Sequence, residues 1–294
     1  MTARRAAAIL ALSPLLLLAH EGEPLQPDDL WTAWSFEPGV VIPLALTALL
    51  YRRGARPGRG VTTLQQACFW AGWTVLALSL VSPLHPLGEA LFSAHMTQHE
   101  VLMLVAAPLL VLSRPLVPLL WGLPFGWRRA LGQWSKTEYA QKTWQVVTRP
   151  FHAWWIHAVA LWVWHAPFLF QATLSSEWVH SAQHLSFLFS ALLFWWSLFY
   201  ARERNYGAGV LYVFTTGVHT SILGALLAFA PTLWYPAYRG TTAAWGLTPL
   251  EDQQLGGLIM WVPAGVVYVA AGLGLFAAWM RESETMVQRS WYAE

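Results

Sequence analysis

The sequence predicts an all-α polytopic membrane protein, in which a bundle of seven transmembrane helices follows an N-terminal signal-like segment. Of its 294 residues, 56% are hydrophobic and only 11% are charged, whereas a typical soluble domain carries roughly 25% charged residues. The 20 tryptophans also fit this class, because indole rings favour the two membrane interfaces. Long apolar stretches separated by arginine-containing loops complete the pattern.

The N-terminus has the features of a secretory leader. Arg4 and Arg5 precede an apolar run over residues 6–19, which matches a signal peptide and is too short to span a bilayer comfortably. Cleavage after Ala19 and retention as an anchor both remain open. The expected organisation is a leader at 1–19, an outer N-terminal segment at 20–35, a seven-helix membrane domain at 36–281 and a cytoplasmic tail at 282–294.

Seven apolar stretches approach the length of about 17–25 residues that a transmembrane helix needs. Helices are expected because each span must satisfy its own backbone hydrogen bonds in lipid. The first stretch is the weakest, since Glu37, Pro38 and Pro43 crowd its start. The predicted spans are roughly Phe36–Tyr51, Leu64–Val81, Met96–Leu112, Trp154–Phe170, Val179–Tyr200, Gly209–Ala230 and Leu255–Met280.

Lysine and arginine lie almost entirely on one side of this predicted bundle. The loops after spans one, three and five and the tail contain 14 of them, and the opposite loops contain only Arg239. By the positive-inside rule, those loops and the C-terminus lie in the cytoplasm and the mature N-terminus lies outside. The long cytoplasmic segment 114–150 is expected to lie along the membrane surface as an amphipathic segment.

Other functional classes find little support. The net charge of +2 does not suggest a nucleic-acid partner. The single cysteine, Cys68, excludes an internal disulfide and any Cys-x-x-Cys motif. We find no nucleophile–base arrangement, no phosphate-binding loop and no clear internal repeat of the kind found in transporters, so the sequence predicts a protein that is not an enzyme.

Two pairs of histidines carry the strongest chemical signal. His95 and His99 open the third predicted span, and His180 and His184 open the fifth at the same membrane level. A separation of four residues puts both imidazoles of a pair on one helix face. Imidazole binds zinc and copper, and facing helices of a bundle can form a metal site. The glutamine before the second histidine of each pair is suited to orient a ligand ring.

The remaining polar candidates have simpler explanations as well. Histidines within spans often hydrogen-bond across helices, which is the expected role of His165 or His219 taken alone. Glu100 and Asp252 are either partners of the histidines or residues at helix entries, and Met103 and Met260 are expected to pack rather than ligate. Structural or surface roles are expected for four further histidines, His20, His85, His152 and His157.

Five stretches of the chain resemble the CtaG family of cytochrome c oxidase assembly factors of the caa(3) type. The resemblance runs from about residue 35 to 280, and it depends on the order and spacing of these stretches rather than on one motif. They are AHMTQHEVLMLVAAPLLVLSRP at 94–115, LWVWHAPFLFQATL at 161–174, VHSAQHLSFLFSALLFWW at 179–196, HTSILGALLAF at 219–229 and DQQLGGLIMWVPAG at 252–265.

This resemblance implies a protein of the bacterial inner membrane that is needed to mature a haem-copper oxidase, with an oxidase subunit as its membrane client. It also implies copper as the cargo, destined for the Cu(B) centre. On the matching positions, the candidate ligands are His95, His99, His165, His180, His184 and His219, with Glu100, Asp252, Met103 and Met260 as possible partners. The residues alone support only a histidine-rich site near the outer membrane face.

Two alternatives remain open. Paired histidines in a membrane can ligate haem, which would make the chain a haem-binding redox protein, although two histidines one turn apart are awkward as opposite axial ligands. The histidines could instead only hold the helices together, in a metal-free scaffold that binds an oxidase subunit.

Overall fold

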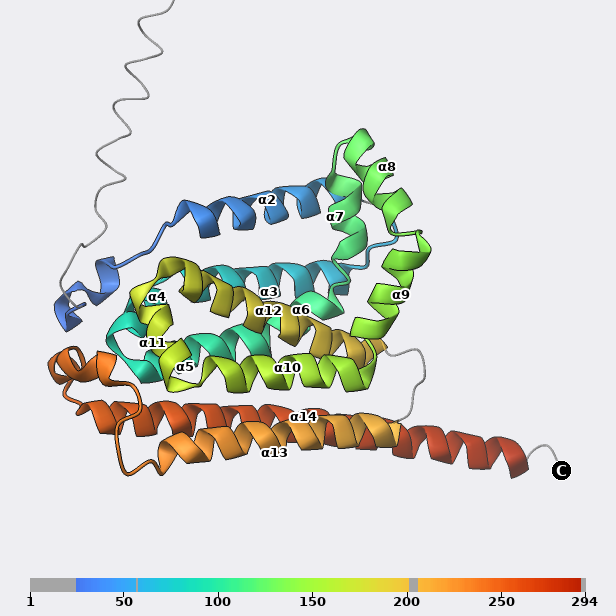
Figure 1. The fold of residues 1–294 in the computed structure, drawn as a ribbon. Coiled ribbons are helices and arrows are strands. Elements are labelled where there is room, and N and C mark those ends of the chain that lie inside the picture. The colour runs from blue at the N-terminus through green and yellow to red at the C-terminus, as the bar shows by residue number, and fades with distance from the viewer. Residues whose placement is uncertain (1–24, 57, 201–205, 292–294) are drawn as a thin grey trace, which may run out of the picture.

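The computed structural model describes residues 25–56, 58–200 and 206–291, and every regular element in this part of the chain is a helix (Figure 1). The predicted leader at 1–19 lies outside the described residues. The α-helices are α2 Pro38–Gly54, α3 Thr63–Val81, α4 Leu84–Ala90, α5 Phe92–Glu100, α6 Ala107–Leu112, α7 Leu116–Gly122, α8 Phe125–Trp134, α9 Glu138–Val147, α10 Pro150–Trp164, α11 Pro167–Ser175, α12 Glu177–Tyr200, α13 Tyr206–Ala228 and α14 Pro249–Trp291. Short 3₁₀ turns, η2 Pro27–Thr32, η4 Pro236–Gly240 and η5 Thr242–Trp245, and a π-helix, η3 Val101–Ala106, complete the described elements.

The membrane character of the chain is confirmed in its coarser form. Five helical stretches of the described chain are long and apolar enough to cross a bilayer, and α10 with α11 forms a sixth if that bent pair is one span. The five are Thr63–Val81, Phe92–Leu112, Glu177–Tyr200, Tyr206–Ala228 and Pro249–Glu284. The first predicted span appears as α2, a helix of 17 residues that contains Pro43, and it is not among these stretches.

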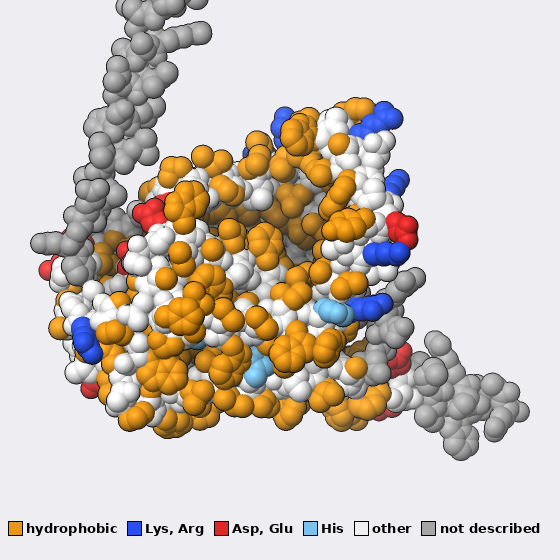
Figure 2. Space-filling view, viewed as in Figure 1, with side chains coloured by type: hydrophobic (Ala, Val, Ile, Leu, Met, Phe, Trp, Pro, Cys, Tyr) orange, Lys and Arg blue, Asp and Glu red, His pale blue; other side chains and the backbone are white. Residues whose placement is uncertain are grey.

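Hydrophobic side chains cover most of the face seen in Figure 2, while lysine and arginine gather along α8 and α9 at one end of the molecule. Large apolar residues on the spans, such as Phe214 and Leu273, are more than half exposed. Because water would penalise such a surface, it fits contact with lipid. The charged end belongs to segment 114–150, which folds as α7, α8 and α9 rather than as one continuous amphipathic helix.

The predicted fourth span is broken. Helix α10 ends at Trp164, α11 begins at Pro167, and the two axes differ by 74°. Ala166 takes an extended conformation between them, as expected for a residue that precedes proline. The break leaves His165 at the end of α10 instead of inside a continuous helix.

The predicted third span is continuous but irregular, because α5 passes through the π-helix η3 into α6. Trp195 of α12 donates its indole N–H to the Met103 carbonyl within the π-helix, at 2.9 Å. Side chains that insert into such irregular turns satisfy carbonyls that have lost their regular partner.

Two long helices, α13 and α14, form an antiparallel pair against the rest of the bundle (Figure 1). A Cβ atom at Gly257 would collide with the Ala228 backbone, and one at Gly224 would lie 2.9 Å from the Gly257 carbonyl oxygen. Small residues at these two positions therefore let the backbones approach closely. Gly256 faces the Phe92 ring, which places α14 directly against the start of α5.

Candidate metal centre

The two predicted histidine pairs come together in the structure. His95 and His99 of α5 have ring centroids 4.3 Å apart, and His180 and His184 of α12 have centroids 4.4 Å apart. Across the two helices, the His95 ring lies 5.2 Å from His180 and the His99 ring lies 5.1 Å from His184. The four imidazoles thus face one another between α5 and α12.

A fifth histidine, His85 of α4, joins this group. Its ring centroid lies 5.2 Å from that of His180 and 5.9 Å from that of His184. The sequence predicts only a structural or surface role for His85, since it lies outside the apolar stretches. The available signal was its place in the loop before span three, at the same predicted membrane level as the two pairs.

The five histidines form two triads that share His184. We call His85, His180 and His184 the outer triad and His95, His99 and His184 the inner triad, because His95 and His99 are the less exposed residues. In each triad one nitrogen per ring lies within 4.8 Å of the other two. Metal–imidazole bonds of about 2.1 Å put ligand nitrogens about 3.5 Å apart, so small ring rotations suffice to close either triad around an ion.

Several of these nitrogens have no hydrogen-bond partner. They are His95 Nδ1, both ring nitrogens of His99, His180 Nε2 and His184 Nε2. Buried polar atoms are nearly always paired, and each unpaired one costs roughly 1–3 kcal/mol. A bound ion would supply the missing partner, so the donor set fits an imidazole-liganded metal such as copper or zinc.

Gln183 orients one ligand of the inner triad. Its Oε1 lies 3.2 Å from His95 Nε2. An amide oxygen can only accept a hydrogen bond, so Nε2 carries the proton and the lone pair of His95 is on Nδ1. Such a contact is the usual way in which a second residue fixes a ligating ring, and here it crosses from α12 to α5.

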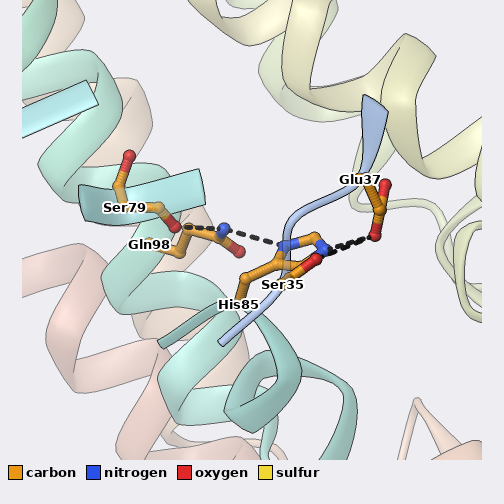
Figure 3. Close-up of polar contacts among 5 residues, drawn as sticks. All are labelled: Ser35, Glu37, Ser79, His85 and Gln98. Atoms are coloured by element: carbon orange, nitrogen blue, oxygen red, sulfur yellow. Dashed lines mark hydrogen bonds and ion pairs between the residues drawn. The ribbon is translucent and has the colours of Figure 1, made fainter. Parts of the chain in front are cut away.

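His85 is held on both sides, as Figure 3 shows. Gln98 Nε2 donates to the Ser79 carbonyl at 2.6 Å and lies 3.1 Å from His85 Nδ1, while Glu37 Oε1 lies 3.5 Å from His85 Nε2. The hydrogen bond with His85 lowers the pKa of Glu37, which lies just before α2. Both ring nitrogens of His85 are therefore engaged, unlike those of His99.

Asp252 positions α5 from a distant part of the sequence. Its carboxylate accepts hydrogen bonds from Phe92 N at 2.6 Å, Ser93 N at 3.1 Å and Ser93 Oγ at 2.5 Å. Helix α5 has no side-chain cap of its own, so Asp252 of α14 satisfies its free N–H groups and places negative charge at its positive end. Of the two roles expected for Asp252, the structure supports helix entry, although the helix is α5 rather than its own.

His165 lies near the cluster but outside both triads. Its Nδ1 donates to the Leu161 carbonyl at 2.6 Å, its Nε2 has no partner, and its ring packs on Phe187, which the His99 ring also contacts. His219 lies elsewhere, with its ring 5.2 Å from that of Trp154 on α10. The triads found in the described chain include neither residue.

The remaining candidate partners are Met260, Met103 and Glu100. Met260 packs with Phe92 in one hydrophobic cluster, and Met103 packs in another. Glu100 is next to His99 in the chain and has a buried oxygen, Oε2, without a partner.

Comparison with known proteins agrees with this architecture. Residues 44–282 match the model of the cytochrome c oxidase caa3 assembly factor family, Caa3_CtaG. The chain is 23% identical over 270 residues to uncharacterized proteins of Mycobacterium bovis and Mycobacterium tuberculosis, and 21% identical over 279 residues to one of Mycobacterium leprae. These alignments cover 88–90% of this chain but only 41–42% of each relative.

The chain thus spans about two fifths of the length of the curated relatives it matches. No solved structure is significantly similar to it. The family match covers most of the chain, including all five clustered histidines and Asp252. The chain therefore belongs to the Caa3_CtaG family of cytochrome c oxidase caa3 assembly factors.

Proposed function

We propose that this protein handles copper for the Cu(B) centre of cytochrome c oxidase through its histidine cluster and acts as an assembly factor rather than an enzyme. The observation that carries the proposal is the convergence of two histidine triads in which five ring nitrogens lack hydrogen-bond partners. Family membership supplies the oxidase and the membrane setting, and imidazole chemistry is compatible with copper.

The ligand set is suited to transfer rather than storage. Both triads consist of histidine alone, without a thiolate, and soft thiolate ligands are those that hold Cu(I) most tightly. A carrier needs only to bind its cargo more weakly than the acceptor does. In this proposal copper enters from the periplasmic side, binds between α5 and α12, and passes within the bilayer to an oxidase subunit.

The test is the copper content and visible spectrum of the detergent-purified full chain. Wild type loaded with Cu(I) should hold about one copper per chain, and the double variant His99→Ala/His184→Ala should lose it, because each triad then lacks at least one ligand. The variant His152→Ala is the matched control, since the His152 ring meets the Phe151 ring edge to face and belongs to neither triad, and it should retain copper.

Other outcomes separate the alternatives. A Soret band in the purified protein would indicate haem instead. Wild type that binds no copper, together with an oxidase subunit that co-purifies even with the double variant, would favour the metal-free scaffold. His165→Ala and His219→Ala test the two remaining predicted ligands, of which His165, with its free Nε2 beside the cluster, is the one expected to weaken binding.

A further inference from the structure

We propose that the two triads are successive binding sites for a single metal ion. The ion enters at His85, binds the outer triad and then moves to the inner triad while it stays bound to His184. This inference rests on the proposed function and adds a route and a direction to it. It also assigns a role to His85 and to three carboxylates around it.

Exposure is greatest at the Glu37 end of this route and least at His95 and His99. Glu37 has 46% of its side chain exposed. His85 is 8% exposed and His180 is 7% exposed, whereas His99 is 2% and His95 is 0% exposed. Solvent is therefore nearest to the ligands at the Glu37 end. His184, which both triads share, is 8% exposed, and His95 and His99 lie deeper.

Acidic residues surround the exposed end. Glu89 and Glu177 are exposed, and together with Glu37 they lie close enough to His85 or to one another to interact electrostatically. Clustered negative charge on a protein surface raises the local concentration of cations and speeds their association. Next to His85 lies the buried, unpaired Nε2 of His180, which would give the captured ion a further buried ligand.

The shared residue makes a stepwise transfer possible. His184 belongs to both triads, and its ring centroid lies 4.4 Å from that of His180 and 5.1 Å from that of His99. Its Nε2 is unpaired. An ion bound there can exchange its other ligands one at a time without returning to water, because neighbouring imidazoles are already within reach on both sides.

The hydrogen bonds give the transfer a direction. To ligate at the outer triad, His85 must give up its contact with either Gln98 or Glu37. At the inner triad, His99 has no hydrogen bond to lose, and His95 keeps its bond to Gln183 while its free Nδ1 ligates. Binding at the inner triad therefore removes an unfavourable burial of polar atoms without breaking a contact, and the ion should favour the inner triad at equilibrium.

The experiment measures the rate at which the detergent-purified full chain removes Cu(I) from its bicinchoninate complex, followed by the loss of the complex's absorbance, and the amount bound at the end. Wild type should bind one copper. His85→Ala should bind the same amount but load at least tenfold more slowly. Glu37→Gln, which keeps the size of the side chain, should load several-fold more slowly and with a weaker dependence on salt.

His99→Ala should load at the wild-type rate but release its copper to excess chelator at least tenfold faster, since only the outer triad remains complete. Normal elution from a sizing column and an unchanged unfolding midpoint are required of each variant, and Glu37→Gln provides the test if His85→Ala does not fold. A control variant, His152→Ala, should match wild type in rate and amount.

The outcomes distinguish the route from the function. If wild type binds no copper, the proposed function fails and the route fails with it. If wild type binds one copper but His85→Ala and Glu37→Gln load as fast as wild type, the function stands and the route is wrong. Two coppers bound per chain would also overturn the route, because the two triads would then be separate sites rather than successive sites for one ion.

Discussion

Replacing Asp252 by alanine should destabilise the protein and weaken the metal centre together, although this residue is not a ligand. The substitution removes the carboxylate that accepts hydrogen bonds from Phe92 N, Ser93 N and Ser93 Oγ, at a position that is fully buried. Loss of a helix N-cap costs about 1 kcal/mol, and a buried donor left without a partner costs roughly 1–3 kcal/mol. We therefore expect a loss of about 3 kcal/mol in the free energy of unfolding.

The effect on copper follows from the position of α5. His95 and His99 lie on the first turns after this cap, so fraying of those turns would misplace two of the three inner ligands. Unfolding in detergent by added denaturant gives the free energy, and copper content after dialysis gives the binding. Asp252→Asn should fall between alanine and wild type. The amide oxygen can still accept from one backbone N–H group, whereas the amide nitrogen is a donor and cannot accept from the other.

A neighbouring residue provides the control. Within the described chain, the exposed carboxylate of Glu251 accepts hydrogen bonds from Thr248, just before α14. Glu251→Ala should therefore leave copper binding unchanged. An Asp252→Ala protein that unfolds at the wild-type denaturant concentration and keeps its copper would show that Asp252 does not hold α5 in place.

Three further predictions concern packing and ligand linkage. Gly257→Leu should force α13 and α14 apart and lower the free energy of unfolding by about 1–3 kcal/mol or more. Gly265→Ala should be neutral, because there is open space where its Cβ would lie. Unfolding in detergent compares the two variants. Trp195→Phe should lose the hydrogen bond to the Met103 carbonyl and about 1 kcal/mol in the free energy of unfolding. If the control substitution Trp178→Phe at an exposed position costs as much, that hydrogen bond does not explain the loss. Copper at 100 times its dissociation constant should stabilise the folded protein by about 2.7 kcal/mol, and the stabilisation should vanish on chelation and be absent from His99→Ala/His184→Ala.

The sequence was informative where regular helix geometry decides the outcome. The spacing of His95 with His99 and of His180 with His184 was enough to place each pair on one face, and their shared membrane level predicted that the pairs would meet. The all-helical class and most of the long apolar helices followed from hydrophobic length alone. The count of seven spans is not confirmed, because Pro43 lies in a short α2 and Pro167 breaks the fourth span.

Most other contacts between segments distant in sequence could not be predicted. His85 reaches the cluster only because the short helix α4 folds back along α5, and no periodicity marks a helix of seven residues. The bond between Asp252 and Ser93 joins positions 159 residues apart. His219 resembles the other membrane histidines in the sequence, but α13 packs against α10 and α14, which turns this ring toward Trp154.

The π-helix at Val101–Ala106 implies that the winding of this span, and not only its composition, orients the histidine ligands. A π turn contains one residue more than an α turn, and each residue of an α-helix advances the chain by about 100° around its axis. If the same six residues wound instead as a regular α-helix, the extra residue would turn His95 and His99 by about 100° relative to α6. The imidazoles would then face away from α12, with every ligand still present in the sequence.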